Sequence, residues 1–244
     1  MTFHQAMRQL VLEHGAVRNS YLQRFRCGDL SDEELNQFAV EFYNFARFFP
    51  RILVSQLVNT EDEQIADELT KVLYSELGDG DAKRRHELLY RDFLRSLDID
   101  VRDAMTRPML VSTRAYIEGM EQLYGDGNHQ RALGASFGLE NMAITMWDHL
   151  IPGLTRLKTT RHPRMDLTYF TFHRELEATH EEAMEHAVEA LQGSGRQMSD
   201  GDEEDFRLGV TEVLGYLEGF WMGLDHRRPH SPDRTPPELY PHAA

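Results

Sequence analysis

The chain has 244 residues, of which 41% are hydrophobic, so it can bury the core of one domain and is not disordered by composition. Asp and Glu number 41 against 26 Lys and Arg, and the resulting formal charge of -15 argues against nucleic-acid and anionic membrane partners. The single cysteine, Cys27, excludes an intramolecular disulfide and a thiolate metal cage.

Apolar residues recur at helical spacing along the chain, and no segment alternates apolar and polar residues as a strand does. Glycine-rich segments at 78–81, 125–128 and 193–195 separate the predicted helices. In chain order these helices span residues 3–26, 31–58, 62–77, 83–97, 102–124, 128–157, 165–192 and 201–225. Pro50 and Pro108 are expected to kink or interrupt the second and fifth helices. The sequence therefore predicts an all-α bundle of seven to eight helices.

We expect a single domain over residues 1–226, because no linker or internal repeat divides them. Residues 227–244 contain five of the nine prolines and form a Pro-rich tail. The first residues, MTFHQAMRQLVLEHG, lack the basic and apolar regions of a signal peptide, and no stretch is apolar enough to cross a membrane. These features predict a cytoplasmic protein.

The helix predicted over 165–192 carries charged residues on the face that should be buried. At about 100° per residue, His173, Glu177 and His180 fall within about 60° of one another. Apolar residues such as Met184 and Ala187 share this face, while most other charges of the helix point elsewhere. Two histidines and a carboxylate on one buried face predict metal ligands.

Three other helices direct an ionisable residue inward in the same way. Glu140 lies within an apolar stripe that continues to Ile144, and Glu76 ends the stripe of the helix over 62–77. His86 begins the apolar series that continues at Leu89. Each residue alone has an alternative: His86 as a hydrogen-bonded core histidine, and Glu76 as a helix cap or an arginine partner. The coincidence of all four segments indicates one shared site.

Burying these carboxylates costs several kcal/mol each unless a positive charge compensates them. The buried stripes contain no Lys or Arg, so a metal is the natural source of that charge. Oxygen and imidazole donors without thiolate suit non-heme iron or manganese, and helical bundles hold pairs of iron ions with such residues.

Three motifs carry a resemblance to a known family: YSELGDGDAKRRHELLYRDFL, FGLENMAITMWDHLIPGL and YFTFHRELEATH. Over about residues 15–225 the chain resembles the heme-oxygenase-like di-iron oxidases and oxygenases, which are iron-containing redox enzymes with the fold of thiaminase and pyrroloquinoline-quinone biosynthesis proteins. The resemblance implies a heme-oxygenase-like bundle and two Fe(II) ions, or a Mn/Fe pair, with dioxygen as co-substrate. It assigns the metal ligands to Glu76, His86, Glu140, His173, Glu177 and His180.

Departures from subgroups of this family narrow the expected reaction. The para-aminobenzoate synthases sacrifice one of their own tyrosines and use a lysine near the iron site. In this chain those two positions are occupied by Leu22 and Leu150. A further tyrosine of these enzymes, before the last motif, corresponds to Tyr169, which is therefore a candidate catalytic residue. N-oxygenating members carry an extra carboxylate where this chain reads FARFFPRIL. We therefore expect a biosynthetic enzyme that performs oxidative C–H or C–C chemistry on a small amino-acid-derived or carboxylate-bearing substrate. An amine N-oxygenase and a para-aminobenzoate-synthase-like enzyme remain alternatives.

The aromatic second helix offers a weaker prediction. Tyr43, Phe45 and Phe49 are candidates to line a substrate pocket, and Arg47 is a candidate partner for a substrate carboxylate. The alternative is that the aromatic residues fill the core and that Arg47 lies at the surface.

Other functional classes leave the inward-facing ligands unexplained. They include a non-catalytic helical interaction protein, a thiaminase-type hydrolase using Cys27, and a heme protein using His14. For the redox enzyme, we expect a small-molecule substrate and a homodimer.

Overall fold

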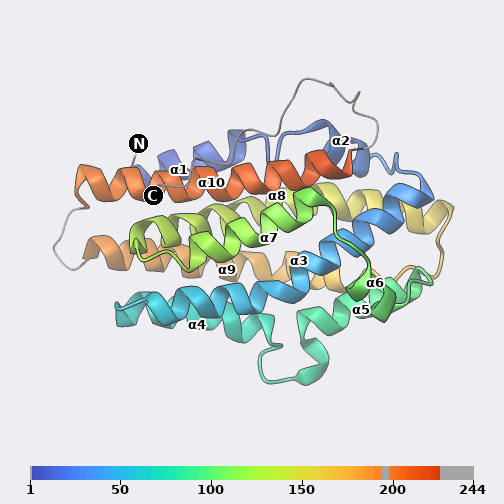
Figure 1. Ribbon diagram of the computed structural model, residues 1–244, viewed down its shortest axis with the longest axis horizontal. Helices are drawn as coiled ribbons and strands as arrows, with labels where there is room; N and C mark the ends of the chain where they lie inside the picture. Colours follow the sequence, from blue (N-terminus) through green and yellow to red (C-terminus); the bar gives the residue numbers. More distant parts are fainter. Residues whose placement is uncertain (1, 194–197, 226–244) are drawn as a thin grey trace.

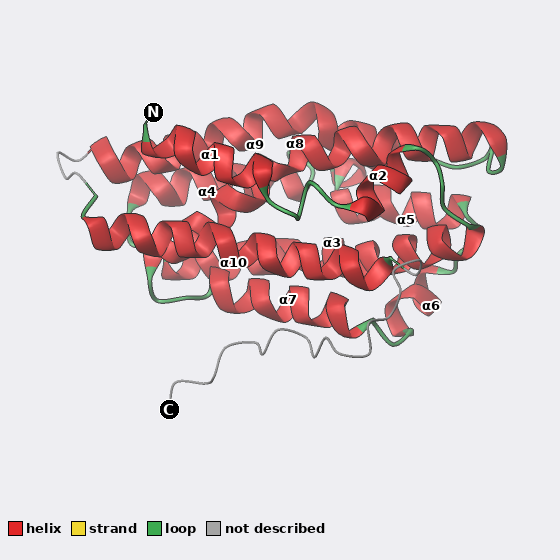
Figure 2. Cartoon of the chain, turned by 90° about the horizontal axis from the view of Figure 1, so that it is seen from above, coloured by secondary structure: helices red, strands yellow, loops and turns green. Residues whose placement is uncertain are grey.

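Several helices begin at a capping residue that stands directly before the helical segment in the sequence. In the computed structural model, which describes residues 2–193 and 198–225, Thr2, Ser31 and Ser199 each accept a hydrogen bond from the backbone of the third helical residue, whose side chain bonds back. The described residues form ten α-helices and one short 3-10 helix (Figure 2): α1 Phe3–Glu13, α2 Ser20–Arg26, α3 Asp32–Asn59, α4 Glu63–Glu76, η1 Ala82–Arg84, α5 His86–Ser96, α6 Val101–Thr106, α7 Val111–Tyr124, α8 His129–Thr160, α9 Thr168–Gly193 and α10 Asp200–Leu224.

The predicted helix over 3–26 is wrong in its continuity, because the chain leaves the helical conformation at His14 and resumes it at Ser20. Asn19 stabilises this break in two ways. Its side-chain oxygen accepts from the Leu22 amide, and its side-chain nitrogen donates to the Gly15 carbonyl.

The predicted helix over 102–124 is interrupted around Pro108, as expected, and forms two helices, α6 and α7. Arg107 has an extended backbone because the following Pro108 disfavours the helical conformation. The amide of Leu110 then donates to the Glu41 carboxylate of α3. Pro50, by contrast, lies inside a continuous α3.

Most helices run along the long axis of the molecule, while the short α5 and α6 lie at one end (Figure 1). The long α8 contacts α1, α2, α7, α9 and α10, and α9 also contacts α4 and α5. α3 packs against α4, α5 and α7. The helices α4, α5, α8 and α9, which carry the predicted metal ligands, are thus neighbours around one interior.

The packing of α8 on α10 requires glycine at two positions. A Cβ atom on Gly134 would lie 2.0 Å from the Phe206 carbonyl oxygen, and one on Gly209 would lie 1.9 Å from the Arg131 carbonyl oxygen. These glycines let the two backbones approach closely enough to exclude any side chain between them.

Over the described residues, every helix falls short of the length and apolar character that a membrane span requires. The predicted Pro-rich tail, residues 227–244, lies outside the described part of the chain.

Candidate metal centre

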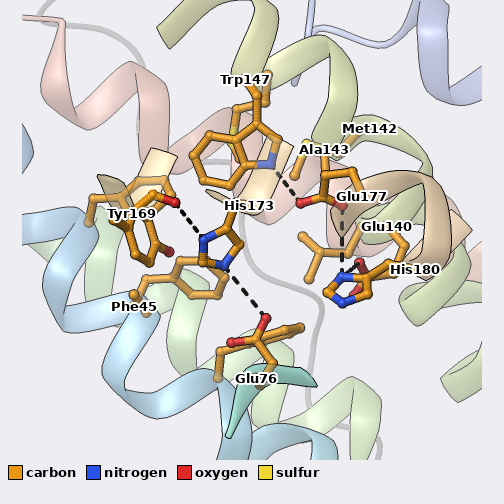
Figure 3. Close-up of a pocket in the computed structure, with 15 residues that line it drawn as sticks. Phe45, Glu76, Glu140, Met142, Ala143, Trp147, Tyr169, His173, Glu177 and His180 are labelled. Atoms are coloured by element: carbon orange, nitrogen blue, oxygen red, sulfur yellow. Dashed lines mark hydrogen bonds and ion pairs between the residues drawn. The ribbon is translucent and has the colours of Figure 1, made fainter. Parts of the chain in front are cut away.

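Six ionisable side chains meet in the interior of the bundle. Glu76 is the last residue of α4 and His86 is the first of α5. Glu140 lies in α8, and α9 contributes the remaining three, His173, Glu177 and His180. Each of the six is between 2% and 6% exposed. Figure 3 shows five of them converging on one pocket, and all six are the residues that helical spacing predicted to point inward.

The first group of potential ligands, the first triad, consists of Glu76, His86 and His173, with one donor atom of each within 4.8 Å of the others. His86 Nδ1 lies 2.9 Å from Glu76 Oε2, and His173 Nε2 lies 3.7 Å from Glu76 Oε1. Neither ring nitrogen of His86 has an aligned hydrogen-bond partner among the described residues. Buried nitrogens without partners are costly, and a metal ion would satisfy them.

The second triad consists of Glu140, Glu177 and His180, again with one donor atom of each within 4.8 Å of the others. His180 Nδ1 lies 3.4 Å from Glu140 Oε2 and 3.9 Å from Glu177 Oε2. Glu177 Oε2 has no hydrogen-bond partner in the described part of the chain. Three oxygen or imidazole donors in each triad fit iron or manganese.

A sharp turn brings Glu76 and His86 together across the gap between α4 and α5. Gly78, Asp79 and Gly80 all have positive φ values, of 96°, 52° and 83°. A Cβ atom on Gly78 would lie only 2.4 Å from the Asp81 carbonyl oxygen. Glycine at residue 78 is therefore needed for the turn that completes the first triad.

Hydrogen bonds outside the triads fix the orientation of two histidines. The Nδ1 of His173 lies 2.9 Å from the Tyr169 carbonyl oxygen, so it donates there and leaves Nε2 free as a ligand. The Nε2 of His180 lies 3.1 Å from Ser75 Oγ, which leaves Nδ1 facing Glu140. Such bonds commonly hold metal-binding imidazoles in place.

The protonation states of Glu76 and His173 favour metal binding. Burial acts to raise the pKa of Glu76, but the neighbouring His86 and His173 outweigh it and hold that pKa well below its ordinary value. Burial, followed by the charge of His86, lowers the pKa of His173. An ionised carboxylate and a neutral imidazole are the forms that bind metals.

The second triad retains protons when no metal neutralises it. Burial and then the Glu140 carboxylate raise the pKa of Glu177 to about 7. Burial lowers the pKa of His180, but the bond and charge of Glu140 outweigh burial and raise it to about 9. A metal ion in this triad would take the place of these protons.

A small cavity of about 50 Å³ adjoins members of both triads. Its apolar wall includes Phe45 and Phe49, two of the candidate pocket residues, and Tyr169, whose ring centroid is 4.2 Å from that of His173. Sequence reasoning did not assign Trp147 or the methionines to this wall. The sequence could have indicated Trp147, because it lies two helical turns after Glu140 and therefore on the same face of the helix.

Tyr43 and Arg47 are not among the residues that line the cavity. The hydroxyl of Tyr43 donates to Glu87 Oε1 at 2.6 Å, on the side of α3 that faces α5. Arg47 donates to the side chain of Asn44 and lies over the Phe48 ring. The structure thus separates these two residues from the site with which the sequence grouped them.

Helical bundles that hold metal ions with carboxylates and histidines from facing helices form a class of metalloproteins, and the two buried triads place this chain in that class. The family model described as iron-containing redox enzyme matches residues 36–210, and the chain belongs to this family. The chain is therefore an oxidoreductase that uses iron, as the resemblance of its motifs implied.

Comparisons with known proteins agree with this assignment. The chain is 27% identical over 215 residues to 4-chloro-allylglycine synthase from Streptantibioticus cattleyicolor, covering 88% of this chain and 79% of that protein. Among solved structures, a CadD-like protein of unknown function from Nostoc punctiforme has a TM-score of 0.75 at 16% identity, covering 91% of this chain and 95% of that chain.

A domain of unknown function from Shewanella denitrificans, which has a heme oxygenase-like fold, has a TM-score of 0.66 at 16% identity and covers 91% of this chain and 88% of that chain. A TenA homolog from Pseudomonas syringae pv. tomato has a TM-score of 0.73 at 13% identity, covering 91% of this chain and 89% of that chain. These likenesses confirm the predicted heme-oxygenase-like, all-α fold.

Proposed function

We propose that this chain is a dioxygen-activating oxidase or oxygenase in which each triad holds one ferrous ion, or one of the two holds manganese. The observation that carries the proposal is the pair of buried triads beside one cavity. The donors of each triad lie within 4.8 Å of one another, and His86 and Glu177 retain ligand atoms that make no aligned hydrogen bond with any described residue.

Glu76, His86 and His173 would hold one ion, and Glu140, Glu177 and His180 the other. The bound ions would supply the reduction of dioxygen and the oxidising power that acts on the substrate. The protein supplies orientation: Tyr169 and Ser75 accept the imidazole hydrogen bonds that direct His173 and His180. The aromatic wall of the cavity excludes water from the reacting groups.

The charge of the site supports a substrate that carries a carboxylate. Two divalent ions bring four positive charges against three carboxylates, and no Lys or Arg is among the described residues that line the cavity. An anionic group is therefore favoured near the ions. The small apolar cavity suits a short hydrocarbon portion of the same molecule.

The described residues of α3 that face the cavity include no carboxylate, which supports C–H or C–C chemistry over N-oxygenation. These lining residues are apolar: Phe42, Phe45, Ala46 and Phe49. The buried Glu41 points away, since its carboxylate accepts from the Leu110 amide. Because the relative named above is a synthase of an unsaturated amino acid, we propose oxidation of an amino-acid-derived substrate in a biosynthetic pathway.

Two further expectations complete the proposal. The strongly negative charge supports a small-molecule rather than nucleic-acid partner. A homodimer in the cytoplasm stays a prediction, to be checked by sedimentation and by localisation of the native protein.

Anaerobic titration with Fe(II) tests the metal site. We expect about two ions bound per chain, a transient absorbance on exposure to dioxygen, and substrate-dependent oxygen consumption with amino acids bearing aliphatic side chains. His173→Ala and Glu140→Ala each remove a donor from a different triad, so each should lose one ion. Glu182→Ala, at an exposed position of α9, is the matched control. If the two triad variants bound iron as the parent does, the assignment would be wrong.

A further inference from the structure

Trp147 contacts a member of each triad although it is not itself a ligand. It is 3% exposed and lines the cavity from α8. Its indole Nε1–H donates to Glu177 Oε1 at 2.6 Å, and its ring centroid lies 5.3 Å from that of His173 (Figure 3). An indole N–H can only donate, so this bond has a fixed direction.

The bond leaves Glu177 with one available oxygen. Oε1 is occupied by Trp147, whereas Oε2 has no hydrogen-bond partner among the described residues and lies 3.9 Å from His180 Nδ1. The carboxylate is 3% exposed, so water does not compete for either oxygen. A donor bond to a buried carboxylate is short and strong, and it restricts rotation of the group.

We propose that Trp147 is a positioning residue that presents Glu177 to the metal of the second triad through a single oxygen, Oε2. The inference rests on the proposed two-metal function. Without the indole N–H, both oxygens of Glu177 become available, and the carboxylate loses its fixed orientation. The metal of the second triad then binds more weakly and with a different number of oxygen ligands, while the first triad keeps its affinity.

The second tryptophan of the chain makes a clean test possible. The chain contains two tryptophans, and Trp221 is also fully buried, but its Nε1 has no hydrogen-bond partner in the described structure. Trp221→Phe therefore leaves Trp147 as the single tryptophan without disturbing the proposed bond. Trp221 is not among the residues that line the cavity.

The experiment replaces only the indole N–H of Trp147. The Trp221→Phe protein is produced in a tryptophan auxotroph supplied either with tryptophan or with benzothienylalanine, in which sulfur replaces the N–H while the ring shape is nearly kept. Both proteins are titrated anaerobically with Co(II), and binding is followed by calorimetry and by the visible absorption of Co(II), whose intensity and energy depend on coordination number. Circular dichroism verifies equal helical content.

With tryptophan, we expect two Co(II) ions per chain. With benzothienylalanine, one ion should bind unchanged and the other about 10- to 100-fold more weakly, with an altered absorption spectrum for that ion. Equal affinities and equal spectra for the two proteins would overturn the role of Trp147 while leaving the two-metal site intact. Fewer than two ions in the tryptophan protein would instead reject the two-metal proposal, and the inference with it.

If Trp221→Phe lowers helical content, the parent chain with both tryptophans replaced gives the same test. Trp221 contributes no N–H bond in the described structure, so any difference in metal binding is assigned to Trp147.

Discussion

Replacing Glu177 by glutamine should stabilise the metal-free protein while it weakens metal binding. Glutamine keeps the shape of the side chain and an oxygen that can accept from Trp147, but it removes a buried negative charge beside Glu140. The charge is unfavourable in the absence of metal, because burial and Glu140 raise the pKa of Glu177 from 4.5 to about 7.

The size and sign of the effect follow from this pKa. A carboxyl group whose pKa is higher in the folded state costs no stability below its unfolded pKa, and its ionisation disfavours folding increasingly as the pH rises from the unfolded value of 4.5 to the folded value of about 7. At about 1.36 kcal/mol for each pKa unit, the ionised Glu177 costs on the order of 3 kcal/mol at pH values near 8 and less than about 1 kcal/mol near pH 5. For a chain of this length, 3 kcal/mol corresponds to roughly 6–12 °C in Tm.

Thermal denaturation of chelator-treated protein measures the effect. Glu177→Gln should raise Tm by roughly 6–12 °C near pH 8 and by much less near pH 5. Glu182→Gln changes the same net charge at an exposed position of the same helix and should leave Tm nearly unaltered. An equal or lower Tm for Glu177→Gln near pH 8 would refute the electrostatic reasoning. With Fe(II) present, the parent should have the higher Tm, because Glu177→Gln lacks a charged ligand.

Two further substitutions test the supports of the triads. Ser75→Ala removes the acceptor for His180 Nε2 and should weaken the second metal about 10- to 100-fold in a Co(II) titration, whereas Ser75→Thr, which keeps a hydroxyl, should retain most of the affinity. Gly78→Ala places a side chain at a φ of 96° and against the Asp81 carbonyl, and should lower stability by at least about 1–2 kcal/mol in urea denaturation and weaken the first metal. Gly219→Ala, in open space within α10, should instead raise stability by up to about 1 kcal/mol, and an equal response of the two glycine variants would contradict the role of the turn.

The sequence could predict which ionisable side chains lie in the interior because charged residues on a buried helical face are exceptions to an otherwise regular pattern. His173, Glu177 and His180 share the face of α9 that also buries Ala183 and Met184. A leucine at any of these positions would carry no information. Helical phase alone therefore identified the side chains that the structure brings into the interior.

Helical phase also explains where the prediction of the pocket failed. The cavity-lining residues of α3, at positions 42, 45, 46 and 49, follow the spacing of one helical face. Tyr43 and Arg47 each lie one residue, or about 100°, beyond that face. Composition alone grouped these aromatic and basic residues together, whereas their angular positions separate them.

Long-range contacts set the features that local patterns did not reveal. Pro108 indicates the interruption before α7, but the contact at the start of α7 comes from Glu41, which is distant in sequence and accepts the Leu110 amide. The approach of Glu76 to His86 depends on three consecutive positive φ values. The sequence shows the two glycines of this turn, Gly78 and Gly80, but glycines alone do not specify the direction of a turn.

The two triads make the folded protein and its metal mutually dependent. Without metal, His86 lacks an aligned hydrogen-bond partner among the described residues, and Glu177 and Glu140 place two carboxylates close together away from water. These groups cost free energy that an apolar core would not, and metal binding removes the cost. The same interactions that disfavour the metal-free fold therefore increase its affinity for metal, and a sequence optimised for stability alone would lose them.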